Sequence, residues 1–135
     1  MNKGFVAILG ALALAGCNAV SDTKAAEQGV DALHQAFSAG QFATVYDGSA
    51  PEMKNSISRD AFVSTFGGVY GRTGAYKSGK TTGWKVNYGT GGNIVALNRD
   101  AQFQNARGTE EFVFRVQGGK AVLAGYHVKT DLRVE

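Results

Sequence analysis

A glycine-rich stretch carries the most suggestive chemical motif in the chain. Residues 74–81 read Gly-Ala-Tyr-Lys-Ser-Gly-Lys-Thr and match the phosphate-binding loop pattern letter for letter. Such a loop binds phosphate because a strand leads into it and a helix N-terminus follows it. Here a helical pattern precedes the motif, and residues 82–88 alternate like a strand. The sequence therefore predicts a glycine-rich strand start and no nucleotide site.

Groups for acid–base or metal chemistry are few. The 135 residues include two histidines and one cysteine, too few ligands for a multi-cysteine zinc site. His127 is predicted to be a packing or surface residue, and His34 is predicted to be exposed beside the apolar face of a helix. Glu27 and Asp31, one helical turn apart, are expected to be solvated. We therefore expect no catalytic residue, no cofactor and no bound metal.

The aromatic residues are many for a chain of this length. They form one set of candidate core residues: Tyr70, Tyr76, Trp84, Tyr88, Phe103, Phe112, Phe114 and Tyr126. Two interpretations stay open, because such residues either fill a core or line a ligand cavity. The cavity interpretation uses Tyr70, Trp84, Phe114 and Tyr126. A cavity enzyme would also need a buried carboxylate, whereas Asp100 is opposite in parity to Phe103.

A basic stretch runs from residue 61 to residue 99. It holds Arg72, Lys77, Lys80, Lys85 and Arg99 and no acidic residue. Such a stretch could contact anionic lipid or glycan. The competing interpretation is a solvated sheet edge on which lysines oppose aggregation. Simple alternation places Lys77 and Lys85 on one strand face and Lys80 on the other, which argues against a single basic row.

The chain begins with the pattern of an export signal. Lys3 precedes an apolar run at residues 4–13, and Leu-Ala-Gly-Cys follows at residues 14–17. The run is too short to span a membrane. This pattern resembles the bacterial lipoprotein signal. The resemblance implies cleavage before Cys17, attachment of a diacylglycerol to the Cys17 thiol, acylation of the new amino terminus, with palmitate among the acyl chains, and anchoring to membrane lipid.

The resemblance also implies a location. By similarity to enterobacterial sorting, Asn18 after the cysteine favours the outer membrane, with the protein facing the periplasm. Loss of Lys3 with the signal peptide leaves 13 basic and 11 acidic residues. This small excess does not favour nucleic-acid binding. The predicted division is a signal peptide at 1–16, a lipidated cysteine and tether at 17–23, and one domain at 24–135.

The mature chain shows a helical period first and a strand period afterwards. Helices are predicted at 24–39, 41–46 and 59–70, with Ser58 as a cap and Gly71 as a stop. On the first helix, Ala26, Val30, Leu33 and Phe37 share one face. Alternation then predicts strands at 76–88, 94–104, 110–117 and 120–129, with a two-residue turn at Gly118 and Gly119. Phe112, Phe114 and Val116 share one face of the third strand, and Val122, Ala124, Tyr126 and Val128 share one face of the fourth. This order predicts an α+β fold, with helices covering one face of an antiparallel sheet.

Two longer stretches carry a resemblance to a fold family. Residues 37–52 read Phe-Ser-Ala-Gly-Gln-Phe-Ala-Thr-Val-Tyr and then Ser-Ala-Pro-Glu, and residues 103–128 close the chain with aromatic strands. They resemble cystatin-like domains of the nuclear-transport-factor-2 type, as found in small bacterial lipoproteins. The resemblance implies N-terminal helices packed on a curved four-stranded antiparallel sheet in a cone-shaped fold.

The resulting hypothesis is a non-enzymatic envelope lipoprotein that binds a protein partner or a small apolar ligand. The second hypothesis is a cavity enzyme of the isomerase or dehydratase type on the same fold. The third is contact with anionic lipid or glycan through the basic stretch. A polar constellation inside an open pocket would favour the enzyme, and a filled interior would favour the binding module.

Overall fold

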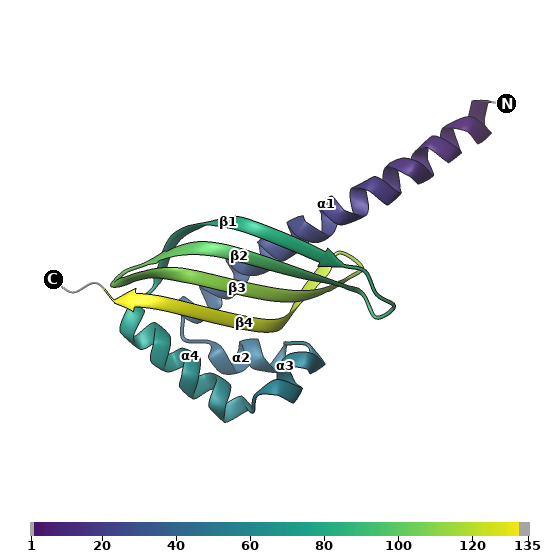
Figure 1. The fold of residues 1–135 in the computed structure, drawn as a ribbon. Helices are drawn as coiled ribbons and strands as arrows, with labels where there is room; N and C mark the ends of the chain where they lie inside the picture. The colour runs from purple at the N-terminus through teal and green to yellow at the C-terminus, as the bar shows by residue number, and fades with distance from the viewer. Residues whose placement is uncertain (1, 133–135) are drawn as a thin grey trace.

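The computed structural model describes residues 2–132 of the chain, and side chains from residue 20 to residue 131. Four helices precede four strands (Figure 1). The elements are α1 (Asn2–Ser38), α2 (Phe42–Asp47), α3 (Pro51–Ser56), α4 (Arg59–Thr73), β1 (Tyr76–Asn87), β2 (Asn93–Phe103), β3 (Ala106–Gln117) and β4 (Lys120–Leu132). The predicted α+β class is confirmed.

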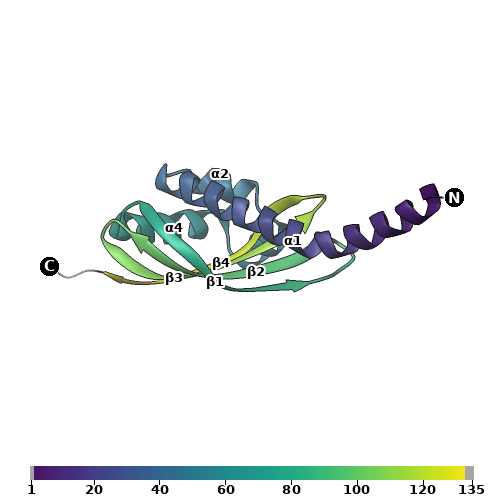
Figure 2. The same ribbon diagram turned by 90° about the horizontal axis from the view of Figure 1, so that it is seen from above.

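The strands form one antiparallel sheet in the order β1-β2-β3-β4. The helices pack on one face of this gently curved sheet and leave the other face uncovered (Figure 2). We call these the helix-facing and the outward face. Gly118 and Gly119 both have positive φ, at 60° and 76°, as a two-residue hairpin turn requires. The predicted hairpin between the last two strands is therefore confirmed.

Helix α1 buries the predicted apolar face, on which Ala26, Val30, Leu33 and Phe37 are at most 9% exposed. Gly40, at a φ of 75°, follows its end. The helix begins at Asn2 rather than near residue 24, and its N-terminal part projects beyond the sheet (Figure 1).

The structure corrects two details of the other helices. Helix α4 is capped as predicted, since the Ser58 hydroxyl accepts a hydrogen bond from Ala61 N at 3.2 Å. It continues through Gly71 to Thr73 and stops at Gly74, which has the positive φ that Gly71 lacks. Helix α3 was not predicted; Pro51 stands at its first turn, where no N–H donor is needed.

The space between the helices and the sheet is filled by aromatic side chains. Fully buried rings come from helices and strands alike: Phe37, Phe62, Phe103, Phe112 and Phe114. Phe37 alone lies within 6.3 Å, centroid to centroid, of five other rings. Of the predicted aromatic set, Tyr70, Phe103, Phe112, Phe114 and Tyr126 are buried in the core, whereas Trp84 and Tyr88 are 60% and 66% exposed.

Strand β1 does not alternate simply, so the predicted face assignment was wrong. Register shifts fall between Tyr76 and Ser78 and between Thr81 and Gly83. Each shift inserts one extra residue into β1, so the residues after it point to the face opposite to the one that simple alternation predicts. As a result Lys80, opposite exposed Asp100, and Lys85, opposite Ala96, share the outward face.

Strand β4 carries a similar irregularity opposite Val113 and Phe114. The sequence placed Val122 and Ala124 on the buried face with Tyr126. In the structure Leu123 pairs with Phe114 and is 4% exposed, while Val122 and Ala124 are only half-buried. The extra residue shifts the alternation only for the residues before Tyr126, so Tyr126 itself is buried, as predicted.

Within the described part of the chain, no helix combines the length and the apolar character needed to cross a membrane. The Cys17 side chain lies outside the described side chains. Cleavage and lipidation at this residue, and the division of the chain at 16 and 23, therefore stay predictions.

Candidate functional site

A carboxylate is buried at the centre of the fold. Glu110 on β3 lies on the helix-facing side, in line with Phe112 and Phe114, and is 2% exposed. His34 Nε2 on α1 lies 2.9 and 3.0 Å from the two Glu110 carboxylate oxygens. The Tyr126 hydroxyl donates to Glu110 Oε2 at 2.5 Å, and the Tyr70 hydroxyl lies 3.3 Å from that of Tyr126. We call these four residues the interior polar cluster.

A second set of polar groups adjoins this cluster. Arg99 on β2 donates to Glu27 Oε2 at 3.1 Å and to the Tyr76 hydroxyl at 3.1 Å. Thr81 joins them, donating to Glu27 Oε1 at 2.5 Å. The Tyr76 ring stacks on the His34 ring at a centroid distance of 3.4 Å and an angle of 8°. The polar side chains of α1 are thereby tied to β1, β2 and β3.

Burial fixes the protonation of both tyrosines in the cluster. Desolvation is the main cause that raises the pKa of Tyr126 far above its ordinary 10.0, and the nearby Tyr70 and Glu110 raise it further. Desolvation likewise raises the pKa of Tyr70. Both hydroxyls therefore keep their protons, and Tyr126 can donate to the carboxylate.

The cluster satisfies most, but not all, of its polar atoms. Since His34 Nε2 faces a carboxylate, we place a proton on this nitrogen. The remaining ring nitrogen, His34 Nδ1, and Arg99 Nε are buried without a hydrogen-bond partner among the described residues. A carboxylate, an imidazole and a phenol in contact are groups that general acid–base catalysis uses.

Access to the cluster is closed. The Glu110 side chain is 0% exposed and the His34 side chain 4%. A pocket of about 420 Å³ has Glu110 in its wall, together with Asn98, Glu111 and His127. These neighbours belong to the outward face of the sheet, so the buried carboxylate does not open into that pocket. No substrate can reach the Glu110 carboxylate in this conformation.

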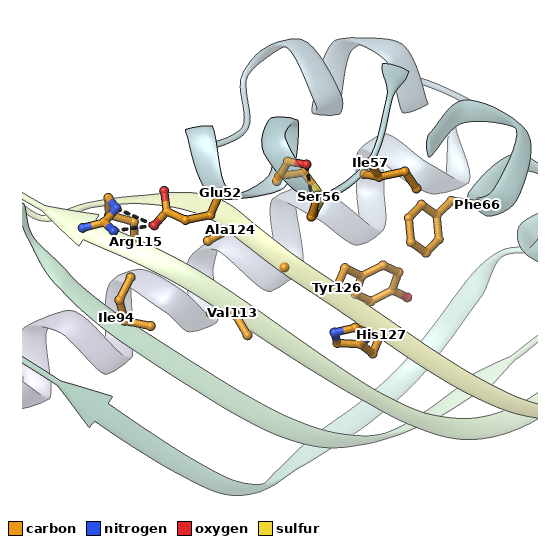
Figure 3. A pocket seen from close by; sticks show the side chains of 12 residues that line it. Glu52, Ser56, Ile57, Phe66, Ile94, Val113, Arg115, Ala124, Tyr126 and His127 are labelled. Atoms are coloured by element: carbon orange, nitrogen blue, oxygen red, sulfur yellow. Dashed lines mark hydrogen bonds and ion pairs between the residues drawn. The ribbon is translucent and has the colours of Figure 1, made fainter. Parts of the chain in front are cut away.

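An open pocket lies instead beside the edge strand β4 (Figure 3). We call this pocket of about 690 Å³ the β4 groove. Apolar side chains dominate it, from helices on one side and from strands on the other: Met53, Ile57, Phe66, Ile94, Val113 and Ala124. The arrangement suits an apolar ligand or an apolar protein segment.

An ion pair closes one end of the β4 groove. Arg115 Nε donates to Glu52 Oε2 at 2.9 Å, a second Arg115 nitrogen contacts the same oxygen, and Arg115 Nη1 donates to Gly91 O at 2.7 Å. The hydrogen bond from Arg115 is the main cause that holds the pKa of Glu52 below its usual range. Beside it, Ala50 N donates to Leu123 O at 2.8 Å and fastens the α2–α3 loop to the edge of β4.

The four proposed cavity-lining residues do not share a cavity. Tyr70, Phe114 and Tyr126 are buried in the filled core, where Tyr126 alone reaches the β4 groove. Trp84 is 60% exposed and lines a separate pocket of about 340 Å³ with Val20, Thr23 and Lys24.

Three further expectations can be compared with the structure. His34 was expected to be exposed and is 3% exposed, because the α1 face that carries Val30 and Phe37 is wide enough to bury it. Glu27 pairs with Arg99, so its expected solvation was only partly right. His127 is exposed, as the surface interpretation expected.

The phosphate-loop pattern lies where the sequence predicted. Helix α4 precedes it and strand β1 runs through it, so no helix begins after the lysine and threonine. Gly74, with a φ of 73°, ends α4. The motif lacks the helix N-terminus that would bind phosphate.

Glu110 was the residue that the sequence interpretation missed. It shares its parity with Phe112, Phe114 and Val116, all of which were placed on one buried face. The same alternation would have placed Glu110 beside them. Among the described residues, no group of three or more histidine, cysteine or acidic side chains is arranged to bind a metal ion.

Comparison with known proteins does not assign the chain. No protein-family model matches it, and no curated protein is significantly similar to it.

Proposed function

We propose that this chain is a bacterial envelope lipoprotein whose domain binds an apolar ligand or an apolar segment of a protein partner and catalyses no reaction. The export pattern and the Leu-Ala-Gly-Cys sequence at residues 14–17 support the anchor. Two or three acyl chains would hold the protein at a bilayer, because one chain alone binds only marginally. Asn18 supports the outer membrane, facing the periplasm.

One observation carries the binding role: the interior is filled, whereas the β4 groove is open and apolar. A filled interior leaves no room for a substrate beside Glu110. The groove lies against an edge strand, whose unpaired backbone groups can accept an additional extended segment. Helices packed on a four-stranded antiparallel sheet are also compatible with a cystatin-like domain, which we propose as the fold family.

The anchor is tested by replacing the acceptor thiol. In a bacterium fed labelled palmitate, the Cys17→Ser chain should accumulate as an uncleaved precursor without label. The Ser21→Ala chain, changed outside the Leu-Ala-Gly-Cys sequence, should mature and take up label as the unchanged chain does. A Cys17→Ser chain that is cleaved and labelled normally would show that the lipoprotein interpretation is wrong.

The binding role is tested by native mass spectrometry of the protein purified from its own host, which detects a retained ligand or partner. Val113 forms part of the groove on the outward face, so Val113→Glu introduces a charge into an apolar wall and should abolish retention. The matched control is Asn98→Glu, on the same face of β2 but outside the groove. Retention by the Val113→Glu chain would place the binding site elsewhere.

The interior polar cluster favours a second candidate, a cavity enzyme of the isomerase or dehydratase type. It supplies the buried carboxylate that such chemistry needs, in contact with His34 and Tyr126. The helices would have to move away from the sheet to admit a substrate. If an activity of this class is detected, Glu110→Gln should abolish it while Glu111→Gln leaves it unchanged.

A further inference from the structure

Large exposed apolar side chains gather at one end of the molecule. Among the described residues they are Val20, Trp84 and Tyr88, at 70%, 60% and 66% exposed. Val20 and Trp84 line one pocket. Tyr88 directly follows β1, and continued alternation along the strand places it on the helix-facing side with Trp84. We call these three residues the aromatic patch.

The aromatic patch lies where α1 leaves the sheet. In both ribbon views the N-terminal part of α1 projects past the end of β1 (Figures 1 and 2). Asn93 Nδ2 donates to Asp22 at 2.6 Å and fastens α1 to the start of β2 at this end. The patch is therefore held in a fixed position relative to the first turns of the mature chain.

The distance from the patch to the proposed anchor is short. Val20 follows Cys17 by three residues, which is about 5 Å along a helix axis and about 10 Å even for an extended chain. An acyl group on Cys17 that enters a bilayer must therefore bring this end of the domain to the headgroups. No spacer is long enough to hold the patch away from the membrane.

The chemistry of the patch fits that position. Trp and Tyr are favoured at membrane–water interfaces because their rings are amphipathic. Lys24 lines the pocket beside Trp84, and residues 61–99 contain no acidic side chain. Basic residues close to a surface are attracted by anionic headgroups.

We propose that the aromatic patch rests in the headgroup region of the membrane that holds the anchor, so that the domain lies against the bilayer in one orientation. This inference rests on the proposed lipidation of Cys17. The β4 groove, lined from α3 and α4 (Figure 3), is a different pocket from the one that Val20 and Trp84 line.

Trp84 is the only tryptophan of the chain, so its fluorescence reports on the patch directly. The full chain is produced in a bacterium that acylates lipoproteins and is reconstituted into vesicles of phosphatidylcholine and phosphatidylglycerol. Relative to the unacylated Cys17→Ser chain without lipid, Trp84 emission should shift to shorter wavelength. Lipids brominated near the headgroup should quench it.

A matched control moves the reporter to the other end of β1. The double variant Trp84→Phe, Arg72→Trp carries its indole on an exposed position of α4 close to Tyr76, about 25 Å away along the strand. Brominated lipid should not quench this chain. Equal quenching at both positions would contradict a single orientation.

Two failures are distinguishable in this experiment. If mass spectrometry finds acyl groups on Cys17 and the protein sediments with vesicles, unquenched Trp84 emission overturns the membrane contact and leaves the anchor intact. If sedimentation shows dimers in which Trp84 is shielded, the patch contacts a second copy of the chain. That outcome also overturns the membrane contact. If Cys17 carries no acyl group, the proposed function fails and the membrane contact fails with it.

Discussion

Two neighbouring glutamates on β3 face histidines in opposite environments. Glu110 points toward the helices and meets His34, and both residues are at most 3% exposed. Glu111 points outward, and its register partner on β4 is His127, which is exposed. One residue along β3 separates a desolvated, hydrogen-bonded pair from a half-buried glutamate and an exposed histidine that are only neighbours across the strands.

The comparison teaches that surroundings, rather than residue type, decide what such a pair contributes. Inside, the carboxylate has lost its water and depends on His34 and Tyr126 as donors, so each partner becomes costly to remove. Outside, Glu111 is half-buried and His127 is exposed, so water can replace either side chain as a partner. The hydrogen bond between His34 and Glu110 holds α1 against the sheet, whereas Glu111 and His127 leave the outward face free for other contacts.

The contrast between Glu110 and Glu111 is tested by deleting each carboxylate in turn. Glu110→Ala leaves His34 and the Tyr126 hydroxyl without their acceptor and should lower the free energy of unfolding by about 3–5 kcal/mol. Glu111→Ala should change it by less than about 0.5 kcal/mol. Urea unfolding of both chains measures the difference. Similar losses would mean that Glu110 is hydrated in solution.

A smaller effect is expected from removing one hydroxyl. Tyr126→Phe keeps the ring in the core and removes only the donor to Glu110. A hydrogen bond to a charged acceptor contributes about 1.5–3 kcal/mol, so a loss in this range is expected. Tyr88→Phe, at an exposed ring, is the matched control and should be neutral. A neutral Tyr126→Phe would show that the cluster does not stabilise the fold.

Much of this architecture could be predicted from the sequence, because it depends on local periodicity. The face of α1, the Ser58 cap and the Gly118–Gly119 hairpin all follow from spacing or turn chemistry. The bulges in β1 and β4 could not be predicted that way, since they depend on pairing between strands. They reversed the assignments of Lys80 and Leu123.

The candidate site was harder to predict for a related reason. Its residues come from α1, α4, β3 and β4, and only the folded chain brings them together. The alternation of buried and exposed residues along β3 could have placed Glu110 on the buried face. Nothing local to His34 indicated that a carboxylate 76 positions away would form a hydrogen bond with its ring. The groove beside β4 likewise depends on α3, a six-residue helix that periodicity did not reveal.

Alkaline pH should sharpen the contrast between buried and exposed tyrosines. The pKa values of Tyr70 and Tyr126 are raised above the ordinary 10.0 in the folded chain. The unfolded chain therefore loses these protons first, so stability is unaffected below pH 10 and falls above it. Each group contributes about 1.4 kcal/mol per pH unit to this fall. Replacing both residues by Phe should flatten the fall measured in urea melts, and Tyr88→Phe should not.

The smallest expected effect concerns the ion pair at the end of the β4 groove. Arg115 lowers the pKa of Glu52 below the usual 4.5. The stabilisation that the ion pair contributes is therefore present above pH 4.5, and it is lost as the pH falls through the lower pKa of Glu52 in the folded chain. Because the two side chains are 30% and 40% exposed, water screens the pair, and Arg115→Ala should cost well under about 1 kcal/mol at neutral pH.

The pair between Arg59 and Asp47 gives the control for this prediction, since it is more exposed at 53% and 56%. Arg59→Ala should be neutral in the same urea melts at pH 7 and pH 4. Arg115→Ala should cost slightly more at pH 7 than at pH 4, because the stabilisation linked to the lowered pKa of Glu52 is complete only above about pH 4.5. A loss as large as that of Glu110→Ala would show that the groove-end pair is desolvated like the inner one. In that case the β4 groove would be occupied or closed in solution, and its role as an open binding site would be lost.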